Sequence, residues 1–170
     1  VHKSLKKKLD QLSYEAEIAV REGCKHLILS DKKISEKKAA IPMILAFGAI
    51  NSKLVNLGIR GFVSINVQTS EALDTHSFAV LLGVGASTIN PYLALDSIYQ
   101  RYEKKLFGKF SYEGCIQRYI KSIDNGLLKI MSKMGISVLS AYRGGCNFEK
   151  VGLSRAIVAE YFTGMISRIS

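Results

Sequence analysis

The sequence has no tryptophan, and its 170 residues include only two prolines, three cysteines and three histidines. Few prolines and a hydrophobic content of 48% exclude collagen-like, low-complexity and disordered chains. Eight tyrosines and seven phenylalanines supply the large side chains that a core needs. A chain of this length buries roughly two thirds of its unfolded surface, so we expect it to fold without disulfides or a metal.

The cysteines Cys24, Cys115 and Cys146 are odd in number and widely separated, with no C-x-x-C pair. This spacing argues against a disulfide framework and against a structural zinc site. The histidines show no metal-ligand spacing, so we do not expect a catalytic transition-metal site. These features predict a reducing, cytoplasmic compartment.

One uncharged stretch, residues 75–95, has the length of a membrane span. It is interrupted by Gly83, Gly85 and the pair Asn90-Pro91, so we expect it to form several short elements. We therefore predict no transmembrane helix.

The formal net charge is +10, and a basic chain is attracted to polyanions. Aromatic and basic residues interleave over 99–112, a mixture that suits single-stranded nucleic acid. An amphipathic helix end whose rings enter the core gives the same pattern, and we favour that interpretation. We keep two functions as alternatives to the main prediction given below. One is a nucleic-acid-binding module centred on Tyr99–Tyr112, and the other is a small flavodoxin-like FMN-binding domain.

Short apolar runs alternate with stretches of helical periodicity along the chain. Such alternation predicts an α/β fold: a mainly parallel sheet with helices on both faces, followed by a mostly helical junction segment that starts near residue 110. We expect helices over residues 4–21, 42–57, 75–82, 91–102, 112–134 and 154–161, and strands over residues 26–30, 62–67, 87–89 and 136–140.

Three local patterns carry possible chemistry. Gly83-Val84-Gly85 follows a helix instead of a strand, so we interpret it as a helix end and a tight turn, not as a phosphate loop. His76 follows two acidic residues, and we favour a capping or packing role over acid–base chemistry. Ser132 and Lys133 precede a glycine turn, a corner that either holds an anion or simply ends a helix.

Residues 126–137, GLLKIMSKMGIS, resemble the segment of the glutamate synthase large chain where the central domain meets the flavin-binding barrel. Other blocks resemble the same family in the same order, and they are residues 27–31, 41–42, 83–86, 90–94, 151–153, 161–164 and 167–168. The chain departs from the family at Ile50-Asn51-Ser52 and at His76-Ser77, where histidines are usual, and within residues 142–147.

The resemblance implies an enzyme that makes two glutamates from glutamine and 2-oxoglutarate, with FMN, an iron–sulfur cluster and an electron donor. Ammonia released by an amino-terminal cysteine nucleophile would travel through a tunnel to the flavin domain. Residues 1–110 would form the end of the central domain, and residues 111–170 the junction and the start of the FMN barrel. We expect this segment to be inactive alone and to hold neither cofactor by itself.

The same resemblance makes Ser132, Lys133 and Arg143 the candidates for contact with the flavin region. The expected partners are the remaining domains of the large chain and a small reductase subunit or ferredoxin, with no membrane or nucleic acid. The electron donor and the role of His76 stay open. The sequence begins without an initiator Met and stops without a closing element. We therefore expect it to be a piece of a longer chain.

Overall fold

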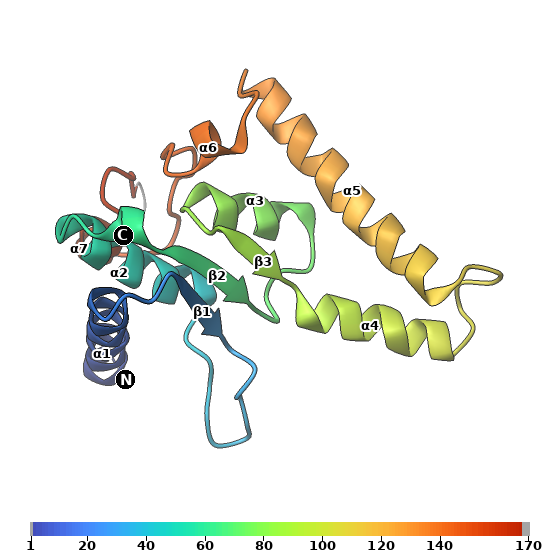
Figure 1. Ribbon diagram of the computed structural model, residues 1–170, viewed down its shortest axis with the longest axis horizontal. Helices are drawn as coiled ribbons and strands as arrows, with labels where there is room; N and C mark the ends of the chain where they lie inside the picture. The colour runs from blue at the N-terminus through green and yellow to red at the C-terminus, as the bar shows by residue number, and fades with distance from the viewer. Residues whose placement is uncertain (1, 168–170) are drawn as a thin grey trace.

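The computed structural model describes residues 2–167 (Figure 1). Helices and strands alternate up to α4, and helices follow. The elements are α1 (His2–Arg21), β1 (His26–Ser30), α2 (Met43–Asn56), a 3₁₀ turn (Arg60–Phe62), β2 (Ser64–Gln68), α3 (Thr75–Gly83), β3 (Thr88–Asn90), α4 (Tyr92–Glu103), α5 (Tyr112–Lys133), α6 (Leu139–Tyr142) and α7 (Arg155–Tyr161). The predicted helices and the first three predicted strands are confirmed, with small shifts at their ends.

The three strands form one parallel sheet in the order β1-β2-β3. Leu27 pairs with Ile65, and Val67 pairs with Ile89, so the apolar residues of neighbouring strands share one face. Each parallel connection needs a crossover helix, which α2 and α3 provide. The α/β class with a parallel sheet is confirmed.

Among residues 2–167, the crossover helices α2 and α3 cover one face of the sheet. Two crossovers of the same hand and direction place α2 and α3 on the same side. Ile65 and Val67 point to that side and are buried. The opposite face carries alternating polar residues, and its Ile28 is 69% exposed.

Helix α2 lies at the centre of the main core, as its nearly continuous apolar sequence predicts. Phe47, Ile50 and Leu54 are at most 1% exposed. The helix packs against α1 on one side, α7 on another and β1 beneath. Gly48 permits the close approach to α7, because a Cβ there would lie 2.8 Å from the Tyr161 carbonyl oxygen.

Helices α4 and α5 extend away from the sheet on the side opposite α1 (Figure 1). They pack against each other, and α5 also packs against α3, where Gly126 lies directly on Thr75. Residues 75–95 form α3, β3 and the start of α4, which confirms that this stretch is divided. No helix within residues 2–167 combines the length and the apolar character needed to cross a membrane.

Residues 136–140 do not form the strand predicted from their apolar pattern. A short helix, α6, begins at Leu139 instead. Ile136 and Leu139 pack against Met131, Leu82 and Tyr142 in a second, smaller core. A hydrophobic run this short does not show whether its period is that of a strand or of a helix, so the sequence alone could not decide between them.

Candidate functional site

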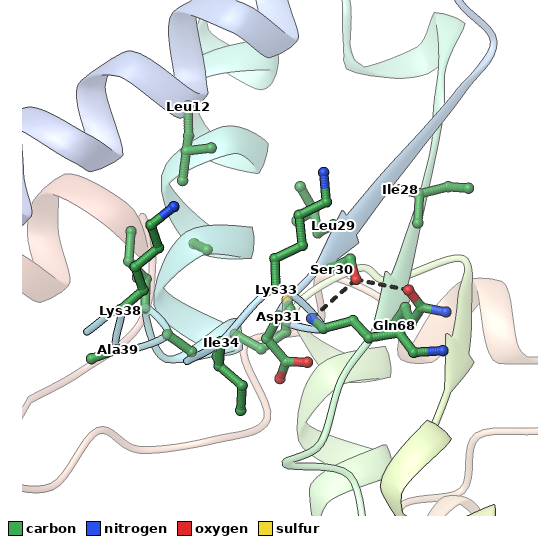
Figure 2. Close-up of a pocket in the computed structure, with 15 residues that line it drawn as sticks. Leu12, Ile28, Leu29, Ser30, Asp31, Lys33, Ile34, Lys38, Ala39 and Gln68 are labelled. Carbon is green, nitrogen blue, oxygen red and sulfur yellow. Dashed lines mark hydrogen bonds between the residues drawn. The ribbon is translucent and has the colours of Figure 1, made fainter. Parts of the chain in front are cut away.

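The candidate site is a hollow of about 730 Å³ at the carboxyl ends of β1 and β2. Ligands of open α/β sheets bind in this region because the loops there converge. Figure 2 shows Leu12 from α1, Lys38 and Ala39 from the β1–α2 loop, and Ser30 and Gln68 from the two strand ends around it. The Ser30 hydroxyl donates to Gln68 Oε1 at 2.7 Å and so ties the strand ends together.

Asp31 directly follows β1 and is the buried carboxylate of the site. It accepts hydrogen bonds from Thr69 Oγ1 at 2.7 Å, from the Ser70 amide at 2.9 Å and from Ser70 Oγ at 3.0 Å. Burial raises the pKa of the Asp31 carboxyl, but these hydrogen bonds, with a further one from Tyr92, outweigh it. The pKa therefore lies below its ordinary value of 3.8, and the group is a charged acceptor at neutral pH.

A second carboxylate occupies the amino end of α2. Glu71 Oε2 accepts a hydrogen bond from the Met43 amide at 3.0 Å. Helix amino ends attract anions because their first amides lack partners and the dipole is positive there. Glu71 supplies that anion from within the chain, so the end of α2 is already neutralised.

Lysines surround the hollow, whereas its inner surface is mostly apolar. Lys33 and Lys38 lie on the exposed loop, and Lys32 lies 5.5 Å from the centre of the Tyr92 ring. Ile41 and Ala46 contribute apolar surface beneath them. A basic rim over an apolar floor is suited to contact with another surface more than to acid–base chemistry.

The polar groups of this site hold the loops of the chain itself. The Asp31 carboxylate accepts hydrogen bonds from the loop that follows β2, and Glu71 accepts one from the first residue of α2. This pairing was not predicted from the sequence, although an acidic residue at the end of one strand and Thr69-Ser70 at the end of the next indicate it. Parallel strands bring such ends to one edge.

Ser132 and Lys133 lie in the last turn of α5 and are exposed. The amides that follow them turn back onto the helix: the Gly135 amide donates to the Ser132 carbonyl at 3.1 Å, and the Ile136 amide to the Met131 carbonyl at 2.9 Å. This corner is a helix carboxyl end with its amides already used, so the hydroxyl, ammonium and free amides are not brought together.

Arg143 lies in a different place, after α6, and donates from Nη2 to the Ser87 carbonyl at 3.2 Å. His76 packs edge-on against Phe148, with ring centres 6.2 Å apart, while Asp74 caps α3 by accepting from the Ser77 amide at 2.9 Å. The interpretation of His76 as a packing residue agrees with this contact.

The glycine pair and the aromatic stretch also have structural explanations. Helix α3 ends at Gly83, and Gly85 has a φ of +116°, which confirms the helix end and turn. The Tyr112 ring packs against Tyr99 and Tyr102, with centres 5.5 and 5.7 Å away. These rings pack between α4 and α5, but Tyr99 is 50% and Tyr112 is 37% exposed, so the expectation that the rings enter the core is wrong for these two.

The three cysteines are free and lie in different environments, from buried Cys115 to exposed Cys146. Within residues 2–167 no three His, Cys, Asp or Glu side chains are grouped closely enough to hold a metal ion. An iron–sulfur cluster needs several cysteine thiolates together, so the residues present do not fit one.

Fold and site together define an α/β module whose polar groups brace its own loops. The family model of the glutamate synthase central domain matches residues 1–154. The chain is 54% identical over 167 residues to the glutamate synthase [NADPH] large chain of Azospirillum brasilense. The aligned residues cover 98% of this chain and 11% of that relative. It is 43% identical over 165 residues to the Bacillus subtilis large chain, covering 97% and 11%.

A ferredoxin-dependent glutamate synthase of Spinacia oleracea chloroplasts is 41% identical over 180 residues, covering 99% of this chain and 11% of the relative. The chain belongs to the glutamate synthase central domain family, as its resemblance predicts. It spans about 11% of the length of these relatives. The family match continues past residue 110, and a domain division at that residue stays a prediction.

Proposed function

We propose that the chain serves as the structural central part of a glutamate synthase large chain. In this role it packs an amidotransferase domain against an FMN domain and helps to enclose the path of ammonia between them. The enzyme as a whole would convert glutamine, 2-oxoglutarate and reducing equivalents into two glutamates. The similarity to large chains of that name along 98% of this chain supports the proposal.

The structural role is supported by the hydrogen bonds of the carboxylates at the sheet's carboxyl edge. Asp31 and Glu71 are committed to hydrogen bonds within the chain, and the hydroxyls beside Asp31, on Thr69 and Ser70, donate to its carboxylate. The proposal therefore assigns FMN and the iron–sulfur cluster to other domains. The partners are those domains and an electron donor, for which both NADPH-dependent and ferredoxin-dependent relatives give precedent. We propose a cytoplasmic location.

The uncovered sheet face is the surface on which the proposal can be tested. Ile28 lies on that face and is 69% exposed, and Leu106, at the far end of the α4–α5 pair, is 67% exposed. In the complete glutamate synthase that carries these residues, Ile28→Glu should disturb domain packing and Leu106→Glu should not. The measurement is glutamate formed and ammonia released for each glutamine hydrolysed.

We expect Ile28→Glu to release ammonia into solution and to lower glutamate yield, with the flavin spectrum unchanged. Unaltered coupling in Ile28→Glu, or turnover of glutamine and 2-oxoglutarate by residues 1–170 alone, contradicts the proposal.

A further inference from the structure

Arg60 lies in the 3₁₀ turn before β2, at the amino edge of the sheet, opposite the hollow. Its guanidinium is fixed by three hydrogen bonds: Nε donates to Asn51 Oδ1 at 2.7 Å, Nη1 to the Val63 carbonyl at 2.7 Å and Nη2 to the Gly85 carbonyl at 3.0 Å. A guanidinium has five N–H donors. One N–H on each Nη is therefore left over.

Arg143 reaches the same turn from the other end of the chain. Its Nη2 donates to the Ser87 carbonyl at 3.2 Å, and only Ala86 separates that carbonyl from the one that Arg60 binds. The turn between α3 and β3 thus holds two guanidinium groups side by side. Both side chains are half-buried, so each keeps a surface that a ligand can reach.

The charges of this pair are not balanced within the described part of the chain. The ion pairs found among residues 2–167 join Lys6, Arg21 and Lys53 to glutamates and do not involve Arg60 or Arg143. Burial lowers the pKa of Arg60, and the neighbouring positive charge of Arg143 lowers it further. Two fixed like charges at short range are unfavourable unless an anion lies between them.

Hydrogen-bond donors near Arg143 are also left without acceptors. The buried side-chain atoms without a partner in the described residues are Arg143 Nε, Asn147 Nδ2 and Tyr142 Oη, all within one short segment. An unsatisfied buried donor destabilises the fold, because it has lost its hydrogen bonds to water without gaining another acceptor. These unpaired donors lie in the same segment as Arg143, one of the two neighbouring positive charges.

We propose that Arg60 and Arg143 form a binding site for a carboxylate. A planar carboxylate accepts two parallel N–H bonds from a guanidinium edge, and arginine is the side chain that makes this contact best. The carboxylate comes either from an Asp or Glu outside residues 2–167 or from a free dicarboxylate. The site consists of this chain's own residues, so it stands whether or not the chain helps to enclose an ammonia path.

The test is hydrogen exchange, followed by mass spectrometry, of residues 139–150 in the full chain, with and without glutarate as the probe. The variants are Arg60→Gln, Arg143→Gln and Arg143→Lys, which keeps the charge. Arg101→Gln is the control, because Arg101 is exposed on α4. Inorganic phosphate is run beside glutarate to separate carboxylate binding from general anion binding.

If the ligand is free, glutarate protects residues 139–150, and Arg143→Gln or Arg60→Gln weakens its apparent affinity about tenfold or more. If the carboxylate belongs to the protein, these residues are protected without glutarate. Arg143→Gln removes that protection and Arg143→Lys removes less. Lowering the pH through about 4 also removes it, since the partner becomes protonated there.

The proposal is overturned if glutarate has no effect and the glutamine variants keep or increase protection, as relief of an unbalanced charge pair would do. It is also overturned if phosphate protects the segment and glutarate does not. Arg101→Gln should behave as the unaltered chain in every arm, and a loss of protection in that variant would show that the response is not specific to the pair.

Discussion

The Ser52 hydroxyl donates a buried hydrogen bond to the Tyr161 carbonyl at 2.9 Å, between residues 109 positions apart in the sequence. It joins the middle of α2 to the end of α7. Helix α7 is thereby held against α2, and Tyr161 and Phe162 are buried in the main core.

Replacing Ser52 with alanine should destabilise the chain by about 1–2 kcal/mol, because the Tyr161 carbonyl then remains buried without a donor. Chemical denaturation measures the change. Ser97→Ala is the matched control, since the exposed Ser97 hydroxyl donates to the Leu93 carbonyl within its own helix at 2.7 Å. Equal losses in both variants would contradict a special role for the Ser52 bond.

Gly48→Ala should cost about 1–3 kcal/mol, in the range for overpacked cores. Its added Cβ would lie 2.6 Å from Phe162 Cε1 and 2.8 Å from the Tyr161 carbonyl oxygen, and the latter is backbone that cannot rotate away. Gly61→Ala is the control, because no atom lies within 4 Å of a Cβ there. Melting temperatures should fall for the first variant and stay nearly unchanged for the second.

Asp31→Asn should destabilise the chain at neutral pH by about 2 kcal/mol, the usual range for a hydrogen-bonded buried charge. The folded-state pKa of Asp31 lies below 3.8, so its contribution is complete above that value and is lost as the pH falls through the folded value. Denaturation at several pH values should therefore show the two proteins converging in acid. A difference that stays constant down to pH 2 would count against the carboxylate.

Lys150 gives a pH dependence of the same sign as Asp31, but in the alkaline range. It is buried, its ammonium lies 4.3 Å from the centre of the Phe162 ring, and burial lowers its pKa below 10.5. The unfolded chain binds the proton more tightly, so stability should rise with pH between the folded value and 10.5. Lys150→Met should stabilise the chain near neutral pH by about 1 kcal/mol and flatten that alkaline rise.

Local sequence patterns were sufficient for the elements that are long or strongly periodic. The alternation of apolar runs predicts β1, and Ser154 marks the start of α7, where its hydroxyl accepts the amide hydrogen bond of a cap. The strand prediction for residues 136–140 failed because five apolar-rich residues fit a strand or a helix equally well. Packing against Met131 decided between the two.

The sites depended on tertiary placement that spacing does not encode. Ser132 and Lys133 are adjacent in sequence to a glycine turn, yet the helix end uses the amides that an anion would need. Arg60 and Arg143 are far apart in the chain, and they meet only because both bind carbonyls of the turn before β3. The covered and uncovered faces of the sheet likewise follow from the hand of its crossovers.

Within residues 2–167, β1 and β3 are the outer strands of the sheet and neither has a partner on its far side. Strand edges of this kind expose amides and carbonyls in a row that another strand can extend. The consequence concerns assembly: the sheet can grow from either side, by further strands of a longer chain or by strands of neighbouring molecules. When residues 1–170 are studied without such additional strands, we therefore expect self-association that increases with protein concentration.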